Sequence, residues 1–369
     1  MIHVIQHHIG KGSYTAWYDI IKFEDPATYH HFGIKEDVEQ KKYGEPPYID
    51  LFEKLVKDIN PQKGDYIFAD SKYVCHRPIE TDEYLTNLSK KHNNCKFVLF
   101  EDDNSFKYTD NEHFLYFSNI FTFMDKEQNH KFNCNYYRYR TVLQDYYPHL
   151  DWFVNQFRLN VRQKKMNMII GADKKHRLQV FRYCYRIGLD KDSWMGYSAF
   201  SRQYNDSDLS DDLIQFRNEN IPVILDTLYE DSCRGSVNVE IPPLPITSTS
   251  YISCICETMI LTEDQIHLSE KSFNPFLSKN IPLILGSAKI NEYLKSEGFW
   301  LAEDLFDLTP QRGFDAIINQ YIKNLDVINN MSFEDLHNYY LKNGNNIDSN
   351  YHKLKSDFVF KTSNYKRPL

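Results

Sequence analysis

Short apolar runs alternate with longer amphipathic stretches in the first half of the chain. The runs at residues 2–5, 65–69 and 96–100 have the length and composition of buried strands. Residues 49–59 and 81–91 repeat their apolar positions at helical spacing, which predicts helices. Strands that alternate with helices are typical of βαβ units, so a parallel sheet is expected.

The second half repeats this alternation after an aromatic-rich stretch. A strand is predicted near residues 114–123, and a linker at 151–165. Further strands are predicted at residues 166–171, 222–226, 251–256 and 281–285. Further helices are predicted at residues 175–187, 269–279, 289–297, 314–330, 332–343 and 348–360.

The two halves therefore predict an α/β fold with two Rossmann-like domains that face a cleft. The expected domains are residues 1–155 and residues 156–330, followed by C-terminal helices at 331–369 that cross back to the N-terminal domain. Ligands of such sheets bind outside the carboxyl ends of the strands, and a cleft between two halves is a common binding place.

Composition narrows the functional classes. The 369 residues carry a net charge of -8, which argues against a surface devoted to nucleic acid or anionic lipid, although a local basic groove is compatible with it. Seven scattered cysteines form no CxxC pair, which fits a reducing compartment rather than a zinc ribbon. No signal peptide or membrane span is expected, so a cytoplasmic viral or bacterial protein is predicted.

The most informative stretch begins at the predicted strand 251–256. This strand leads into Glu257, and Ser269 is a suitable N-cap that places Glu270 and Lys271 in a helix's first turn. Unpaired N–H groups and the helix dipole make such a turn attractive to a diphosphate. Ser-Glu-Lys is also an ordinary helix start, so the signal is specific only together with Glu257.

The order of strand, Glu, loop, Ser-Glu-Lys, helix and Pro-containing strand resembles the donor domain of the α-1,3-fucosyltransferases. It is also similar to a group of phage and giant-virus glycosyltransferases. Residues 281–286 (IPLILG) stand where the family has I-P-x-I-x-G. The resemblance implies a GT-B-type transferase in which Lys271 binds the donor phosphates, Glu270 faces the ribose and Glu257 lies near the donor sugar.

A second resemblance covers residues 166–189, which are similar to the first strand, loop and helix of the same donor domain. It implies that Arg177 reaches the pyrophosphate, with Lys174 or Lys175 as alternates. A solvated charge cluster is the alternative interpretation. The chain departs from the fucosyltransferase pattern at Thr258, where the family has Asn, and has a longer loop before Ser269. The nucleotide and the sugar (hexosyl, fucosyl or pentosyl) therefore stay open.

An inverting sugar transfer also needs a general base, which the acceptor half normally supplies. Glu101 and Asp102 directly follow the predicted strand 96–100, so they are the candidates, with plain loop carboxylates as the alternative. Further candidates are His7, His8 and Asp70. No clear DxD motif lies between two apolar strands, so neither a metal nor a cofactor is expected, and helix dipole and cations stabilise the leaving group.

The expected activity is transfer of a sugar from a nucleoside diphosphate donor to a hydroxyl. The acceptor is a glycan, a protein or a hydroxymethylated base in phage DNA. The competing hypothesis is a non-catalytic carbohydrate- or nucleotide-binding module of the same fold. The sequence contains neither a P-loop motif nor a GxGxxG motif after a strand, which disfavours a kinase or a dehydrogenase.

Overall fold

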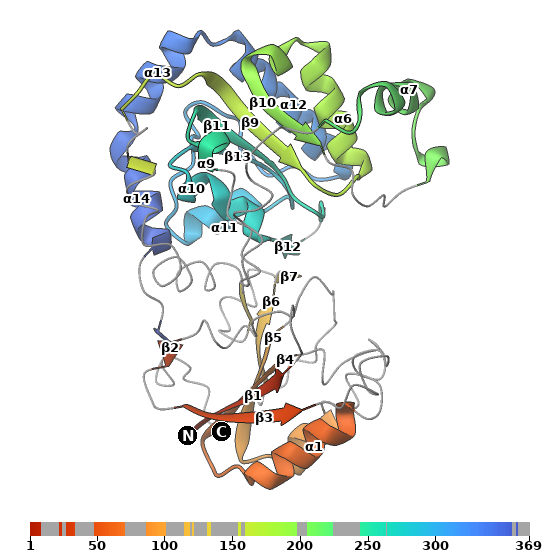
Figure 1. Ribbon diagram of the computed structural model, residues 1–369, viewed down its shortest axis with the longest axis vertical. Coiled ribbons are helices and arrows are strands. Elements are labelled where there is room, and N and C mark those ends of the chain that lie inside the picture. The colour runs from red at the N-terminus through yellow and green to blue at the C-terminus, as the bar shows by residue number, and fades with distance from the viewer. Residues whose placement is uncertain are drawn as a thin grey trace. The chain divides into compact units, whose positions relative to one another are not determined.

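The chain folds into two compact α/β units (Figure 1). The first unit holds Met1–Val142, Gly235–Asn238 and Asp357–Leu369, and the second holds Leu143–Arg234 and Val239–Ser356. The computed structural model describes residues 1–8, 22–23, 27–33, 48–70, 86–100, 114–118, 120–121, 131–133, 154–155, 159–197, 205–223, 244–262, 264–355 and 359–360.

The first unit contains a six-stranded parallel sheet in the order β3-β1-β4-β5-β6-β8. Its strands are β1 (Ile2–His8), β3 (Ala27–Gly33), β4 (Asp65–Asp70), β5 (Cys95–Phe100), β6 (Phe114–Ser118) and β8 (Lys131–Asn133). Val4, Ile67 and Val98 have no exposed surface, as expected for strands covered on both faces. Helix α1 (Tyr48–Ile59) packs Phe52 against Phe97 of β5, with ring centroids 6.5 Å apart.

Three short strands complete the described part of this unit. Strand β2 (Lys22–Phe23) pairs in parallel with β14 (Val359–Phe360), near the end of the chain. Strand β7 spans Ile120–Phe121. The pairing of β2 with β14 places residues from both ends of the sequence in one unit.

The second unit contains a four-stranded parallel sheet in the order β10-β9-β11-β13. Its strands are β9 (Lys164–Ile170), β10 (Ser193–Tyr197), β11 (Ser250–Cys256) and β13 (Ile281–Leu285), with a two-residue strand β12 (Ile266–His267). Its α-helices are α6 (Lys175–Arg186), α7 (Asp211–Asn220), α9 (Leu244–Thr247), α10 (Asn274–Leu277), α11 (Ile290–Ser296), α12 (Phe314–Asn330), α13 (Phe333–Lys342) and α14 (Gly344–Lys355). Its 3-10 turns are η4 (Leu189–Asp192), η5 (Asp206–Asp208) and η6 (Glu270–Phe273).

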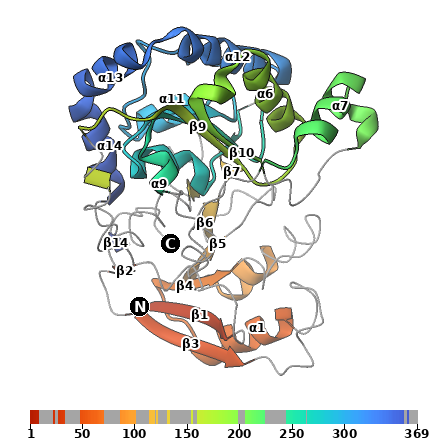
Figure 2. The same cartoon turned by 45° about the horizontal axis from the view of Figure 1, so that its top comes forward.

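Helices cover both faces of this sheet. Helices α6 and α12 pack together on one face, and α9, α10 and α11 lie on the other (Figures 1 and 2). The core beneath α6 and α12 includes Cys184, Cys254 and Cys256. Burial raises the pKa of the Cys256 thiol to about 12, so this side chain behaves as a small apolar group.

The helices after residue 330 are tied to the sheet through buried polar contacts. Arg162 donates hydrogen bonds to the carbonyl oxygen of Ser250 and to the hydroxyl of Tyr340 in α13, and its guanidinium lies 4.3 Å from the centroid of the Tyr340 ring. The side-chain amide of Asn350 in α14 accepts a hydrogen bond from the Trp300 N–H and donates one to the Trp300 carbonyl oxygen. The second unit therefore includes these C-terminal helices and extends along the chain to Ser356.

The strand order creates a switch point between β9 and β11. The chain leaves β9 for β10 on one side of it, and later returns to β11 on the other side. At such a point the loops after two adjacent strands diverge and leave room at the carboxyl edge of the sheet. The residues that follow β9 and β11 are therefore the first place to look for a site.

Most predicted elements are present, and several differ. The helix predicted at residues 348–360 is α14, which spans Gly344–Lys355, and Val359–Phe360 form strand β14 instead. The strand predicted at residues 114–123 is divided into β6 and β7. The helix predicted at residues 269–279 is a 3-10 turn, η6, followed by the four-residue α10, which has Pro275 in its first turn. Proline lacks an N–H group, so residue 275 cannot donate the helical hydrogen bond to the carbonyl oxygen of Lys271 that a continuous helix requires, which explains the break. In the strand predicted at residues 222–226, Val223 forms a single antiparallel bridge with Tyr197, and the rest lies outside the described residues.

No helix in the described ranges is long and apolar enough to cross a membrane.

Candidate functional site

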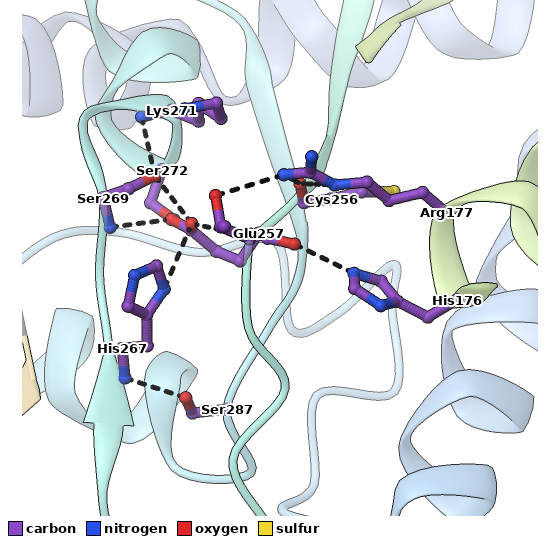
Figure 3. Close-up of polar contacts among 10 residues, drawn as sticks. His176, Arg177, Cys256, Glu257, His267, Ser269, Lys271, Ser272 and Ser287 are labelled. Carbon is purple, nitrogen blue, oxygen red and sulfur yellow. Dashed lines mark hydrogen bonds and ion pairs between the residues drawn. The ribbon is translucent and has the colours of Figure 1, made fainter. Parts of the chain in front are cut away.

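Glu257 follows β11 directly and is the centre of the polar contacts at the switch point (Figure 3). Its backbone N–H donates to the carbonyl oxygen of Leu285 over 2.8 Å, which extends the pairing of β11 with β13 by one residue. Its side chain has no exposed surface. A carboxylate in such a place requires several hydrogen bonds to offset the loss of water.

Four donors surround the Glu257 carboxylate. Ser269 provides its backbone N–H at 3.0 Å and its hydroxyl at 2.6 Å, and Ser272 provides its hydroxyl at 2.5 Å. The N–H of Thr258 is 3.2 Å away. The carboxylate therefore holds the turn that begins at Ser269, twelve residues later in the chain.

His267 makes a further contact with the same carboxylate. Its Nδ1 lies 3.5 Å from Oε2 of Glu257, and both side chains are fully buried. Burial alone raises the pKa of Glu257, but His267, the charge of Lys271 and the Ser269 hydroxyl outweigh it and hold this pKa well below its ordinary value. Glu257 is therefore ionised at neutral pH.

The anchored turn presents Lys271. The Ser269 hydroxyl accepts a hydrogen bond from the Lys271 N–H at 3.3 Å, so Ser269 is an N-cap as the sequence predicts. Lys271 itself is partly exposed, and Glu270 is the first residue of η6. The predicted roles of the Lys271 and Glu270 side chains toward a donor stay predictions.

Arg177 joins the ends of β9 and β11. This side chain is 2% exposed, which differs from the solvated charge cluster considered above. Its Nε and Nη2 donate to the carbonyl oxygen of Cys256 at 3.2 and 2.9 Å, and its Nη1 donates to that of Ala172 at 3.1 Å. Nη2 also reaches the Thr258 hydroxyl at 3.3 Å. Arg177 thus fixes the two loops at the switch point.

His176 connects Glu257 to the start of α6. Its Nε2 donates to the Glu257 carbonyl oxygen at 3.0 Å. Burial, with the charges of Arg177 and Lys174, lowers the pKa of His176 to about 4 despite this hydrogen bond, so the ring is neutral at pH 7. Figure 3 shows His176 and Arg177 on one side of Glu257, with Ser269 and Lys271 on the other.

Two helices begin beside each other at this edge of the sheet. Neither Lys174, the N-cap residue of α6, nor Gly313, that of α12, makes a side-chain cap hydrogen bond. The His176 ring in α6 meets the Phe314 ring of α12 edge-on, with centroids 6.2 Å apart. The first turn of α6 has no acidic residue and begins with Lys175. Two positive dipole ends therefore meet next to Glu257.

Gly286, the last residue of the IPLILG stretch, leaves space for the Glu257 side chain. A β-carbon at position 286 would lie 3.3 Å from Cγ of Glu257 and 2.9 Å from Cδ1 of Ile290. A larger residue would therefore push on both neighbours. The glycine of the motif has a packing reason that is independent of any ligand.

The predicted catalytic carboxylates, Glu101 and Asp102, lie outside the described residues. They follow β5, which ends at Phe100. The other candidate positions end parallel strands of the same sheet, because β1 ends at His8 and β4 at Asp70. Among the described residues, no group of three or more His, Cys, Asp or Glu side chains is arranged to hold a metal ion.

Three residues of this network, His176, His267 and Ser272, were not singled out by the sequence. Ser272 lies three residues after the N-cap, a spacing that brings it to the same side of the turn as Ser269. That spacing is the only local signal for Ser272. No local signal marks His267, because its role depends on the Glu257 carboxylate, ten residues earlier in the chain.

Comparison with models of known protein families finds no match to this chain, and neither does comparison with curated proteins. Function is therefore inferred from the residues of the site and from the resemblance described above.

Proposed function

We propose that this chain is a glycosyltransferase that moves a sugar from a nucleoside diphosphate donor to a hydroxyl acceptor. The observation that carries the proposal is the Ser269–Lys271 turn, held by a buried carboxylate beside the uncapped start of α6. Both features lie at the switch point of a parallel sheet, where ligands of such folds bind.

The chemistry of sugar transfer requires stabilisation of a leaving diphosphate. Backbone N–H groups at the start of α6 and the ammonium groups of Lys271, Lys174 and Lys175 provide positive charge for this purpose. These groups are placed before the reaction begins, so little reorganisation accompanies the departure of the leaving group. The mechanism needs no metal for this step.

The buried residues take positioning roles in this proposal. The carboxylate of Glu257 already accepts hydrogen bonds from Ser269 and Ser272. The guanidinium of Arg177 already donates to the carbonyl oxygens of Cys256 and Ala172. Glu257 holds Lys271 in place, and Arg177 sets the spacing of the two loops. The direct donor contacts fall to Lys271 and the first turn of α6.

The acceptor side belongs to the first unit in this proposal, with the two units in a GT-B arrangement. Glu101 or Asp102 then removes the proton of the acceptor hydroxyl. A glycan, a protein and a hydroxymethylated DNA base all present such a hydroxyl. The proposal places the reaction in the cytoplasm of a bacterial cell or of an infected host.

The first test is binding of nucleoside diphosphates to Lys271→Ala. We expect affinity for the preferred nucleotide to fall at least tenfold, because one cation near the diphosphate is lost. The matched control is Lys342→Ala, an exposed lysine in the last turn of α13. Calorimetric titration measures the affinities, and circular dichroism checks the fold.

Each outcome of this titration is informative. Equal affinity of Lys271→Ala and the unchanged protein would remove the turn from the site. Nucleotide binding without release of nucleoside diphosphate from any sugar conjugate, over a panel of hydroxyl acceptors, would favour the non-catalytic binding module.

A further inference from the structure

The short loop between β9 and α6 carries a buried carboxylate. Asp173 is the third residue after β9 and directly precedes Lys174, the N-cap residue of α6. Only 3% of Asp173 is exposed. A carboxylate that is removed from water needs hydrogen-bond donors from the protein. The hydroxyl of Tyr197 is such a donor, and it lies 2.6 Å from Oδ1 of Asp173.

Tyr197 is held in place by contacts that do not involve Asp173. It is the last residue of β10 and has no exposed surface. Its N–H donates to the carbonyl oxygen of Val223 at 2.8 Å, and its own carbonyl oxygen accepts from the Val223 N–H at 2.9 Å. Its ring meets the Phe181 ring of α6 edge-on, with centroids 5.1 Å apart. These backbone and ring contacts define where the Tyr197 hydroxyl lies.

The loop before α6 is therefore tied to the strands on both sides of β9. On the β11 side, Arg177 donates to the carbonyl oxygens of Ala172 and Cys256 (Figure 3). On the β10 side, Tyr197 donates to the carboxylate of Asp173. Strands β10 and β11 are the two neighbours of β9 in the sheet. The first turn of α6 follows this loop directly, so both ties set its position.

Asp173 is suited to positioning rather than to contact with the proposed ligand. A carboxylate repels a diphosphate, whereas backbone N–H groups and lysines attract it. A negative charge just before the first turn of a helix also interacts favourably with the helix dipole. The hydrogen bond from Tyr197 therefore has a different use from that of the lysines around it.

We propose that Asp173 and Tyr197 form a positioning pair, which holds the first turn of α6 where its N–H groups meet the diphosphate. The inference rests on the proposed function, because it assumes that a diphosphate binds at this turn. Neither side chain contacts the ligand. Without the Tyr197 hydroxyl, the buried carboxylate lacks a donor, and the loop shifts to find another.

Three variants of the full chain separate the hydrogen bond from packing and charge. Tyr197→Phe removes the hydroxyl and keeps the ring against Phe181. Asp173→Asn keeps an oxygen that accepts from Tyr197 but removes the charge, and Asp173→Ala removes both. The matched control is Tyr183→Phe, because Tyr183 of α6 also donates to a carboxylate at 2.6 Å, that of Asp326 in α12. This second bond lies away from the start of α6.

Calorimetric titrations with inorganic pyrophosphate and with UDP, GDP, CDP and ADP measure the effect. We expect Tyr197→Phe and Asp173→Ala to lower the affinity for pyrophosphate and for the preferred nucleotide about tenfold. Asp173→Asn should retain both affinities, which is the rescue expected of a positioning role. Tyr183→Phe should also retain them, although it loses the same kind of bond. Tyr197→Phe keeps the test valid if Asp173→Ala folds poorly.

Three results would overturn the inference and leave the proposed function standing, provided that the unchanged protein binds. The first is unchanged affinity in folded Tyr197→Phe. The second is an equal loss in Tyr197→Phe and Tyr183→Phe, which would indicate a general effect on stability. The third is a loss in Asp173→Asn as large as that in Asp173→Ala, which would make the charge the cause. If neither pyrophosphate nor any nucleotide binds the unchanged protein, the proposed function fails, and the inference with it.

Discussion

Glu257 is a charged side chain with no exposed surface, and its neighbours are arranged to keep it ionised. Glu257→Gln would replace an acceptor by a group that also donates, opposite the hydroxyls of Ser269 and Ser272. We expect the free energy of unfolding of the second unit to fall by about 3 kcal/mol at pH 7. Urea denaturation followed by circular dichroism measures this loss.

The same residue sets a pH dependence whose sign follows from its lowered pKa. The stabilisation by Glu257 is fully present above the ordinary carboxyl pKa, about 4.3, and is lost as pH falls towards the lower pKa of the folded state. The difference between the unchanged protein and Glu257→Gln should therefore shrink below about pH 4. A difference that stays constant from pH 3 to pH 7 would contradict this assignment.

Gly286 and Gly188 offer a matched pair of substitutions by alanine. Gly286→Ala brings a methyl group within 2.9 Å of Ile290, so a loss of about 1–3 kcal/mol is expected, together with weaker nucleotide binding. Gly188 has a φ of 76° and no atom within 4 Å of a β-carbon, so Gly188→Ala costs only backbone strain, about 1 kcal/mol. If Gly188→Ala weakened nucleotide binding as much as Gly286→Ala, the packing explanation would be wrong.

At the scale of elements, the helix starts in this chain differ in how they are capped. Ser332 and Asp335 form a capping box at α13, in which the Asp335 N–H donates to the Ser332 hydroxyl at 3.0 Å. Ser332→Ala should lower the free energy of unfolding by about 1 kcal/mol. Ser210 occupies the same position at α7 without a cap hydrogen bond, so Ser210→Ala should be nearly neutral. Equal effects of the two substitutions would contradict the role of the box.

The sequence predicts elements well where a local pattern defines them. Strand β13 and helix α12 have the predicted bounds, because an apolar run followed by Gly and a long amphipathic repeat are both local signals. The helix expected after Ser269 was interrupted because Pro275 and the contacts of Ser269 and Ser272 with Glu257 favour a tight turn. The contacts with Glu257 involve a residue far away in the sequence, and the periodicity of apolar positions carries no information about such contacts.

Only part of the site was predicted, because the sequence shows local signals but not contacts between residues that are far apart along the chain. Ser269 is the expected N-cap, since capping depends on neighbours in sequence. The burial of Arg177 was not predictable, because its acceptors are carbonyl oxygens that only the pairing of β9 with β11 brings together. A basic residue in a charged stretch looks solvated until the strand order is known.

At the scale of the whole molecule, the proposal assigns donor binding to the second unit and removal of the acceptor proton to the first. Glu101→Ala and Asp102→Ala should leave donor binding unchanged, since the donor groups belong to the second unit. Replacement of the true base should reduce turnover at least 100-fold, the usual contribution of a general base. Release of nucleoside diphosphate in the presence of acceptor measures turnover, and titration measures binding. Full turnover in both variants would place the base elsewhere.

The fixed position of the Ser269 turn has a consequence for the time course of binding. Moving the turn and Lys271 away from β11 would break the hydrogen bonds that Ser269 donates to the Glu257 carboxylate. Because this would leave a charged group without its donors, we expect open forms of the turn to be rare. A ligand then meets a site that is already assembled. Its capture is expected to proceed in a single kinetic phase whose rate rises in proportion to ligand concentration, without a slower rearrangement before or after the encounter.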